Sequence, residues 1–398
     1  MSRHPAAAPV LVFGGGLGLT TLGVIRTLGR AGITTYIVAD AAGLARHSRW
    51  FRPAPVPHAA DDAERDLAGF LDSLPLERAV LVPCSDIWAM SVARLPAASA
   101  ERFPSCLSRP EVLEQLLDKG SFAAALEATG VPHPRTREVG GPQDLSTLPD
   151  DAFTGSFLKP RDSQRFFRRF GVKAFRVSGR ADAVRRMEEI TAAGLAVIFQ
   201  EYIPGPASNH VFVDGFVDRG GRMQAVFARQ RLRMYPLDFG NSSYMVSIAR
   251  DEVEPALESI RHLLAHIGFR GIFSTEFKYD ERDGLFKILE VNARPWWYVE
   301  FTARCGVDVC TMAYHDALGL PVQPAGAYRV GRACVYPYYD YGACRELRHR
   351  GELSLWSWTR AWLVAEQPVL RWSDPLPAVV ETTRGIGRRL RKMLAAFA

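Results

Sequence analysis

The sequence of 398 residues lacks the features of several protein classes. No stretch reaches the roughly 18 consecutive apolar residues that a membrane-spanning helix needs. The first ten residues do not show the order of charged, apolar and cleavage regions that marks a secretory signal. No CxxC pair or Cys/His cluster has the spacing of a zinc site, and we expect the six cysteines to be reduced thiols. These absences favour a globular cytoplasmic protein.

Repeats and low-complexity tracts are also missing, and 47% of the residues are hydrophobic. A chain of this length and composition is expected to fold as two or three domains. The net charge of +6 is not accompanied by any nucleic-acid-binding motif. A polyanionic small molecule such as a nucleotide explains the excess of basic residues equally well. We therefore expect no nucleic-acid partner.

Residues 1–110 predict a Rossmann-like domain. An apolar stretch at 10–13 is followed by glycines, a helical stretch to Gly32 and a second apolar stretch at 34–38. This order is typical of a βαβ unit. This glycine segment lacks the third glycine of the dinucleotide fingerprint. An NAD-dependent oxidoreductase is therefore less favoured but stays an alternative.

A third apolar stretch, 79–83, ends in Cys84-Ser85-Asp86. The carboxyl ends of parallel strands are where open α/β sheets place their ligands. Asp86 has two interpretations, since it either holds the ammonium group of a substrate or caps the helix that follows.

Residues 111–320 predict a second, α+β domain, and 321–398 a C-terminal extension. The expected helices are 111–129, 181–193 and 252–267, and the expected strands are 156–160, 172–178, 197–202, 210–217, 223–234, 271–279 and 285–294. The Asp283-Gly284 turn predicts that the last two strands form a hairpin.

Polar residues alternate along the second strand of this hairpin. Glu290, Asn292 and Arg294 are spaced two apart and share one face, and the hairpin brings Glu276 onto that face, whereas Leu289 is expected to point into a core. Carboxylate and amide oxygens are ligands that Mg²⁺ prefers, and a guanidinium stabilises developing negative charge. The hairpin therefore predicts a site for Mg²⁺ and a phosphorylated ligand.

Two lysines supply cations for such a ligand. Lys159 ends the apolar strand 156–160, and Lys119 follows Asp118 near the middle of the predicted helix 111–129. An ammonium group at either place reaches a phosphate as a point charge. Each lysine alone is typical of a surface, but their order ahead of the hairpin indicates a polyphosphate site.

Five segments together resemble the ATP-grasp superfamily, and most of all its carbamoyl-phosphate-synthase-like branch of D-aspartate-ligase-like, predicted carboxylate-amine ligases. In chain order they are Asp118-Lys119, Phe157-Leu158-Lys159-Pro160, Gln200-Glu201-Tyr202-Ile203-Pro204-Gly205, Glu276, and Glu290-Val291-Asn292-Ala293-Arg294-Pro295. The last segment is the most specific. The resemblance covers residues 1–320 and implies a Rossmann-like preceding domain followed by a two-lobed ATP-grasp domain.

The resemblance also implies roles for individual residues. By this resemblance, Lys119 and Lys159 contact the phosphates of ATP, and a hinge segment contacts the adenine. The carboxylates and the amide of the hairpin bind Mg²⁺, with Mn²⁺ as an alternative, and Arg294 holds an acyl-phosphate intermediate. The hinge residues are Gln200, Glu201 and Ile203, and the metal ligands are Glu276, Glu290 and Asn292.

Two segments depart from the family pattern. The phosphate loop, normally glycine-rich, corresponds to residues 161–173 and keeps only Gly171 as glycine, so we expect basic side chains to replace backbone donors. These are Arg165, Arg168, Arg169 and Lys173. The acidic residue that would hold the ribose hydroxyls is missing after the hinge, and Ser208 or Asn209 is expected to take its place.

Two basic segments each have two interpretations. Arg229, Arg231 and Arg233 share one strand face, which is either a solvated edge strand or a site where Arg231 or Arg233 binds a substrate carboxylate. Residues 384–398 have the pattern of a basic amphipathic helix, which either packs on its own domain or makes weak contact with an anionic membrane surface.

The sequence thus predicts an α/β protein with ATP and Mg²⁺ as cofactors. The expected activity is an ADP-forming carboxylate-amine or carboxylate-thiol ligation through an acyl phosphate, with small-molecule acid and amine substrates and a homo-oligomeric state. The alternatives are a non-catalytic nucleotide-binding module and, less favoured, the NAD-dependent oxidoreductase.

Overall fold

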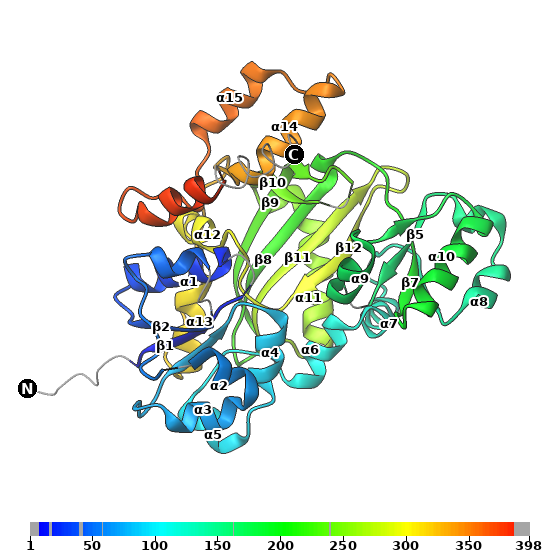
Figure 1. The fold of residues 1–398 in the computed structure, drawn as a ribbon. Coiled ribbons are helices and arrows are strands. Elements are labelled where there is room, and N and C mark those ends of the chain that lie inside the picture. Colours follow the sequence, from blue (N-terminus) through cyan, green and yellow to red (C-terminus); the bar gives the residue numbers. More distant parts are fainter. Residues whose placement is uncertain are drawn as a thin grey trace, which may run out of the picture.

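The fold is α/β and contains three sheets (Figure 1). It was obtained as a computed structural model that describes residues 8–15, 18–39, 43–57, 59–161, 163–238 and 240–385. None of the helices in these ranges is long and apolar enough to cross a bilayer.

The first sheet is parallel, in the order β2-β1-β3, as a βαβ unit requires. Its strands are β1 (Val10–Phe13), β2 (Thr35–Ala39) and β3 (Val80–Pro83). The accompanying helices are α1 (Leu19–Arg30), α2 (Ala59–Arg65), α3 (Leu67–Ser73), α4 (Asp86–Ala93) and α5 (Ala97–Arg102). Apolar side chains from both faces of the sheet are buried, α1 covering one face and α3 and α4 the other.

A small antiparallel sheet of order β4-β7-β5-β6 follows. Its strands are β4 (Thr136–Val139), β5 (Ser156–Pro160), β6 (Phe175–Arg176) and β7 (Val197–Glu201). Three helices pack on one face through Leu145, Phe166 and Met187, namely α8 (Pro142–Ser146), α9 (Ser163–Phe170) and α10 (Arg180–Ala192).

The largest sheet has six antiparallel strands in the order β12-β11-β8-β9-β10-β13. They are β8 (His210–Val217), β9 (Met223–Tyr235), β10 (Asn241–Ile248), β11 (Gly271–Asp280), β12 (Leu285–Asn292) and β13 (Ala333–Val335). One face packs on α11 (Glu254–His266). One end of the other face packs on α12 (Val299–Cys305) and α13 (Val309–Ala317). The other end of that face lies opposite the small sheet.

The last helices are α14 (Pro337–His349) and α15 (Leu355–Val364). Asp374, beyond them, binds Arg26 of α1, and β13 belongs to the six-stranded sheet, so residues after 320 contact both earlier parts of the fold. The division at residues 110 and 320 stays a prediction.

Three local predictions are wrong, each for a physical reason. The helix expected over 111–129 is broken into α6 (Pro110–Leu117) and α7 (Lys119–Thr129), because Asp118 accepts the backbone N–H of Ser121 and caps a new helix. The stretch 161–173 is not a loop but contains α9, and the strand expected over 172–178 shrinks to β6.

Most of the basic tail, from 386 on, lies outside the described residues.

The arginine-rich strand is not at an edge. It is β9, which pairs with β8 and β10, and Arg229, Arg231 and Arg233 are all buried. Arg229 stacks on Tyr298 and faces the buried carboxylate of Asp214, whose pKa burial raises to about 6. A solvated basic face is therefore excluded for this strand.

Candidate active site

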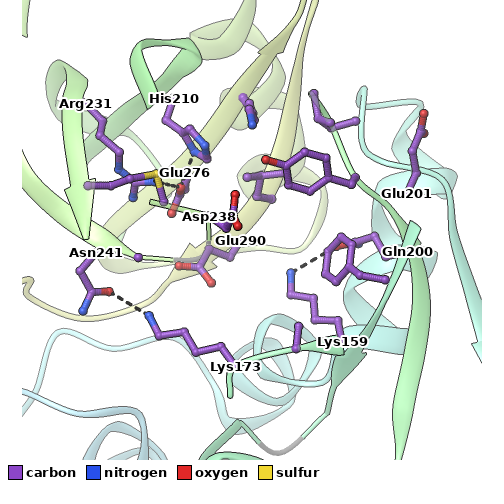
Figure 2. A pocket seen from close by; sticks show the side chains of 18 of the residues that line it. Lys159, Lys173, Gln200, Glu201, His210, Arg231, Asp238, Asn241, Glu276 and Glu290 are labelled. Carbon is purple, nitrogen blue, oxygen red and sulfur yellow. Dashed lines mark hydrogen bonds and ion pairs between the residues drawn. The ribbon is translucent and has the colours of Figure 1, made fainter. Parts of the chain in front are cut away.

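A cavity of about 760 Å³ lies between the small sheet and the six-stranded sheet. Figure 2 shows Glu276 and Glu290 on one wall and Lys159 and Lys173 on the opposite wall. The lining includes nine of the candidate site residues from the sequence: Lys159, Arg168, Lys173, Gln200, Glu201, Ile203, Arg231, Glu276 and Glu290. Residues about 130 positions apart in the chain thus meet at one site.

Glu276 and Glu290 are directly opposite each other on β11 and β12. Like charges in this arrangement repel, so the pair favours a cation between them. A register shift follows Glu276, because Phe277 pairs with Ile288 and leaves Leu289 as an extra residue. This bulge turns Leu289 toward the cavity, which corrects the expectation that it points into a core.

The carboxylate of Glu276 is held by two basic groups. Its Oε1 lies 2.7 Å from His210 Nδ1 and 2.9 Å from Arg231 Nη1. Burial alone would raise the pKa of Glu276, but the charges of Arg231 and His210 override it and hold that pKa well below its usual range. Both contacts use the same oxygen, which leaves Oε2 for a cation.

The donor set fits Mg²⁺. No group of three His, Cys, Asp or Glu side chains gathers anywhere in the described ranges, so a metal site composed only of such ligands is not present there. Two carboxylates and the amide oxygen of Asn292 make a hard oxygen set that water and phosphate oxygens complete. Asn292 donates to Glu290 Oε1 at 3.3 Å, and its own Oδ1 accepts from Arg294 at 3.2 Å, so Asn292 joins the carboxylates to the guanidinium.

Lys159 is partly buried on the opposite wall. Its Nζ lies 3.4 Å from Gln200 Oε1, and Gln200 is itself fixed by a 2.8 Å bond to Thr136. Burial and the nearby charge of Lys119 lower the pKa of Lys159 to about 8. Lys119 does not line the main cavity but lies beside a small adjoining one, which Lys159 and Gln200 also line.

Lys173 enters the cavity from the segment after α9. Its Nζ lies 3.4 Å from Asn241 Oδ1, and burial lowers its pKa. On α9, Phe167 and Arg168 line the cavity, whereas the Arg169 guanidinium stacks on Phe170 at 5.5 Å. Side chains of a basic helix therefore occupy the place where the family pattern has a glycine-rich loop.

The hinge offers backbone groups rather than side chains. The Glu201 carboxylate accepts from Arg135 and from Arg282, so that side chain is committed to ion pairs. The N–H groups of Glu201 and Tyr202 donate to carbonyls of Arg135 and Gly155. Within the described residues, the N–H of Ile203 is the first after the strand without such a partner, and Ile203 is buried against the cavity.

Asn292, Arg294 and Asn209 are placed outside the cavity lining. Arg294 forms a two-point ion pair with Asp86, at 2.7 and 3.2 Å, which joins the first domain to the hairpin. The cap of α4 is Ser85, whose Oγ accepts from Trp88, so Asp86 is not the N-cap. Asn209 donates to Tyr279 O and to Glu281, away from the cavity.

Sequence reasoning missed Lys278. It lies two residues after Glu276 on β11, lines the same cavity, and places its Nζ 4.8 Å from the centre of the Tyr202 ring. Burial and the charge of Arg231 lower its pKa to about 8. The period of two along the strand was the signal that could have found it.

Comparisons with known proteins agree with this architecture. L-amino acid ligase from Bacillus licheniformis superposes with a TM-score of 0.56 at 15% identity, over 82% of this chain and 78% of that one. A complex of N5-carboxyaminoimidazole ribonucleotide synthetase with ADP gives 0.61 at 14% identity, over 87% of each chain. The chain has the ATP-grasp fold.

A sequence relative supports the ATP-grasp assignment. D-aspartate ligase from Enterococcus faecium (strain Aus0004) is 26% identical over 245 residues, which is 60% of this chain and 58% of the relative. The chain thus matches a little over half the length of that relative. No family model matches the sequence. In this ATP-grasp fold the cavity lies between the small sheet and the six-stranded sheet.

Proposed function

We propose that the protein is an ATP-dependent, ADP-forming ligase that joins a small-molecule carboxylate to an amine or, as the less favoured acceptor, to a thiol. The observation that carries the proposal is the cavity itself, in which Glu276 and Glu290 face Lys159 and Lys173. This arrangement suits a nucleoside triphosphate with a divalent cation. The ligases among the related proteins support the same reaction class.

ATP is proposed to lie with its adenine on the hinge and its phosphates between the lysines. The N–H of Ile203 donates to the purine, whose face contacts apolar side chains such as Phe157. Lys159 and Lys173 contact the phosphates, and Arg168 lines the same cavity. Asn209 as a ribose contact and Lys119 as a phosphate contact remain predictions that need a movement of their side chains toward the cavity.

Mg²⁺, bound by Glu276, Glu290 and Asn292, would neutralise the charge of the phosphates when present. Mn²⁺ is the expected alternative ion. His210 and Arg231 hold the Glu276 carboxylate in its ionised form and fix its position. These residues act by positioning and electrostatics, and the mechanism uses no protein nucleophile.

The reaction has two balanced steps. A carboxylate oxygen of the acid attacks the γ-phosphorus, and the bond to the β-phosphate oxygen breaks, which gives an acyl phosphate and ADP. The amine nitrogen then attacks the acyl carbon, phosphate leaves, and the nitrogen loses a proton. Arg294 is placed to neutralise the acyl phosphate, and its partner Asp86 is the candidate group for a substrate ammonium.

Transfer of oxygen from the acid tests the proposal directly. With a carboxylate labelled in its oxygens, an acyl-phosphate route moves one labelled oxygen into the released phosphate, which mass spectrometry detects. A panel of amino acids as acids and amines is the first choice, because the Asp86–Arg294 pair is complementary to a zwitterion. Glu290→Gln is expected to abolish ADP formation and leave the fold intact, whereas Glu188→Gln on the exposed face of α10 changes neither.

Binding measured by thermal unfolding distinguishes the alternatives. A ligand at about 100 times its Kd stabilises the folded state by about 2.7 kcal/mol. Stabilisation by Mg-ATP without acid-dependent ADP formation supports the non-catalytic nucleotide-binding module, and stabilisation by NAD alone supports the oxidoreductase.

The cellular setting is part of the same proposal. None of the six cysteines, all of which the structure describes, forms a disulfide, which fits a reducing compartment such as the cytoplasm. A homo-oligomer also remains part of the proposal, and light scattering tests it.

A further inference from the structure

The C-terminal part of the fold exposes large apolar side chains. No residue of α15 is buried, and Trp356 is 76% exposed, Leu363 81% and the following Trp372 91%. Figure 1 shows α15 at the margin of the molecule. Its inner side chains Ala361 and Trp362, and Ala365 directly after it, pack against Tyr244, Ala333 and Val335 of the six-stranded sheet. The C-terminal apolar surface comprises Leu355, Trp356, Leu363, Val364, Leu370, Trp372, Leu376 and Val379. Exposed apolar residues at this density mark a contact with a protein or a lipid.

The orientation of α15 is fixed from its inner side. Trp358 and Trp362 donate their indole N–H groups to the buried carboxylate of Asp340, at 2.8 and 2.7 Å. Asp340 also receives two hydrogen bonds from Arg233 of β9. Because one helix face is held by these bonds, the side chains of Trp356 and Leu363 are directed away from the protein.

The exposed charges around this surface are mostly positive. Between residues 341 and 385, all of which the structure describes, the exposed acidic residue is Glu352, whereas five arginines are exposed: Arg345, Arg348, Arg350, Arg360 and Arg384. Tryptophan and leucine beside arginine are the side chains that bind an interface of anionic lipids. A second copy docked through the same surface would bring two sets of arginines together, which disfavours it.

We propose that the C-terminal apolar surface binds a membrane surface rich in anionic lipids. Trp356, Leu363 and Trp372 enter the interfacial region, and the arginines contact lipid phosphates. The sequence after residue 385 adds Arg388, Arg389, Arg391 and Lys392, which carry the same charge. This surface is separate from the cavity, so the inference does not depend on the proposed ligase activity.

Sedimentation with vesicles tests the proposal on the full chain. The protein is expected to sediment with vesicles of phosphatidylcholine and phosphatidylglycerol in equal parts, and much less with phosphatidylcholine alone. The double variant Trp356→Ser, Leu363→Ser is expected to lower the partition coefficient at least about tenfold, since both apolar anchors are lost. The variant Arg348→Gln, Arg350→Gln, Arg360→Gln is expected to remove the preference for the anionic vesicles.

The control is Leu285→Ser, which removes a 45% exposed leucine from the start of β12 and is expected to leave vesicle binding unchanged. Absence of binding to anionic vesicles overturns the proposal. So does binding that survives the double variant, because the contact then lies elsewhere. A stable dimer in sedimentation velocity that the double variant dissociates also overturns it and assigns the surface to a second copy.

Discussion

Binding of Mg-ATP is expected to weaken as the pH rises from 7 to 9, because Lys159 loses its charge in that range. Its pKa is lowered to about 8 by burial and by Lys119, so in the free protein it is about 91% charged at pH 7 and about 9% at pH 9. Phosphate oxygens favour the charged form. If the bound lysine stays charged throughout, the Kd rises about tenfold, or about 1.4 kcal/mol, between these two pH values.

Calorimetry measures this effect in two ways. The Kd is determined at pH 7 and pH 9, and titrations at pH 8 in buffers of different ionisation enthalpy give the protons taken up, expected to be about 0.5 from Lys159. Lys159→Arg is the matched control, because a guanidinium stays charged over this range. The substitution removes the contribution of Lys159 and leaves those of Lys173 and Lys278. A Kd that does not change with pH in the native protein, or the same proton uptake in Lys159→Arg, would refute the reasoning.

Three further predictions follow from contacts of single side chains. Arg168→Ala is expected to weaken Mg-ATP binding in calorimetry, because Arg168 lines the cavity. Arg169→Ala loses only a stack on Phe170 and is expected to leave Mg-ATP binding unchanged. Equal losses of affinity in the two variants would contradict this placement of α9. Arg294→Lys cannot keep the two-point pair with Asp86. We expect ADP formation by this variant to fall at least about tenfold while Mg-ATP binding is retained. Loss of Mg-ATP binding would instead place Arg294 at the nucleotide. Arg26→Met leaves the buried Asp374 carboxylate without its cation, whereas Glu300 keeps Arg371. The substitution is expected to lower the free energy of unfolding by about 3–5 kcal/mol in urea, against no change for the exposed Arg30→Met; a loss below 1 kcal/mol, the size typical of an exposed pair, would contradict the burial of this pair.

The parts of the site that the sequence predicted well are those with a strict local period. Glu276 and Glu290 were expected on one face because strand side chains alternate, and they are direct cross-strand neighbours. Lys159 was found because it ends an apolar strand, and the structure places it in the same cavity. For these residues the local rule and the tertiary fold require the same arrangement.

The errors come from side-chain and inter-strand contacts that apolar spacing does not show. Apolar spacing alone suggested one helix over 111–129, but the side chain of Asp118 competes for backbone N–H groups and ends it. The bulge at Leu289 depends on the register of two strands, which no single-strand pattern contains. The partners of Arg233 and Arg294 lie 107 and 208 positions away, so the sequence could not show that both guanidinium groups are already paired.

The bond between Arg26 and Asp374 spans 348 positions and constrains how the chain is made. At a translation rate of about 5–20 residues per second, Arg26 leaves the ribosome roughly 20–70 s before its carboxylate partner is synthesised. During that interval a guanidinium destined for a fully buried position has no counter-charge from Asp374, so α1 cannot complete its native packing. The first domain of the chain therefore completes its folding only after translation has passed Asp374.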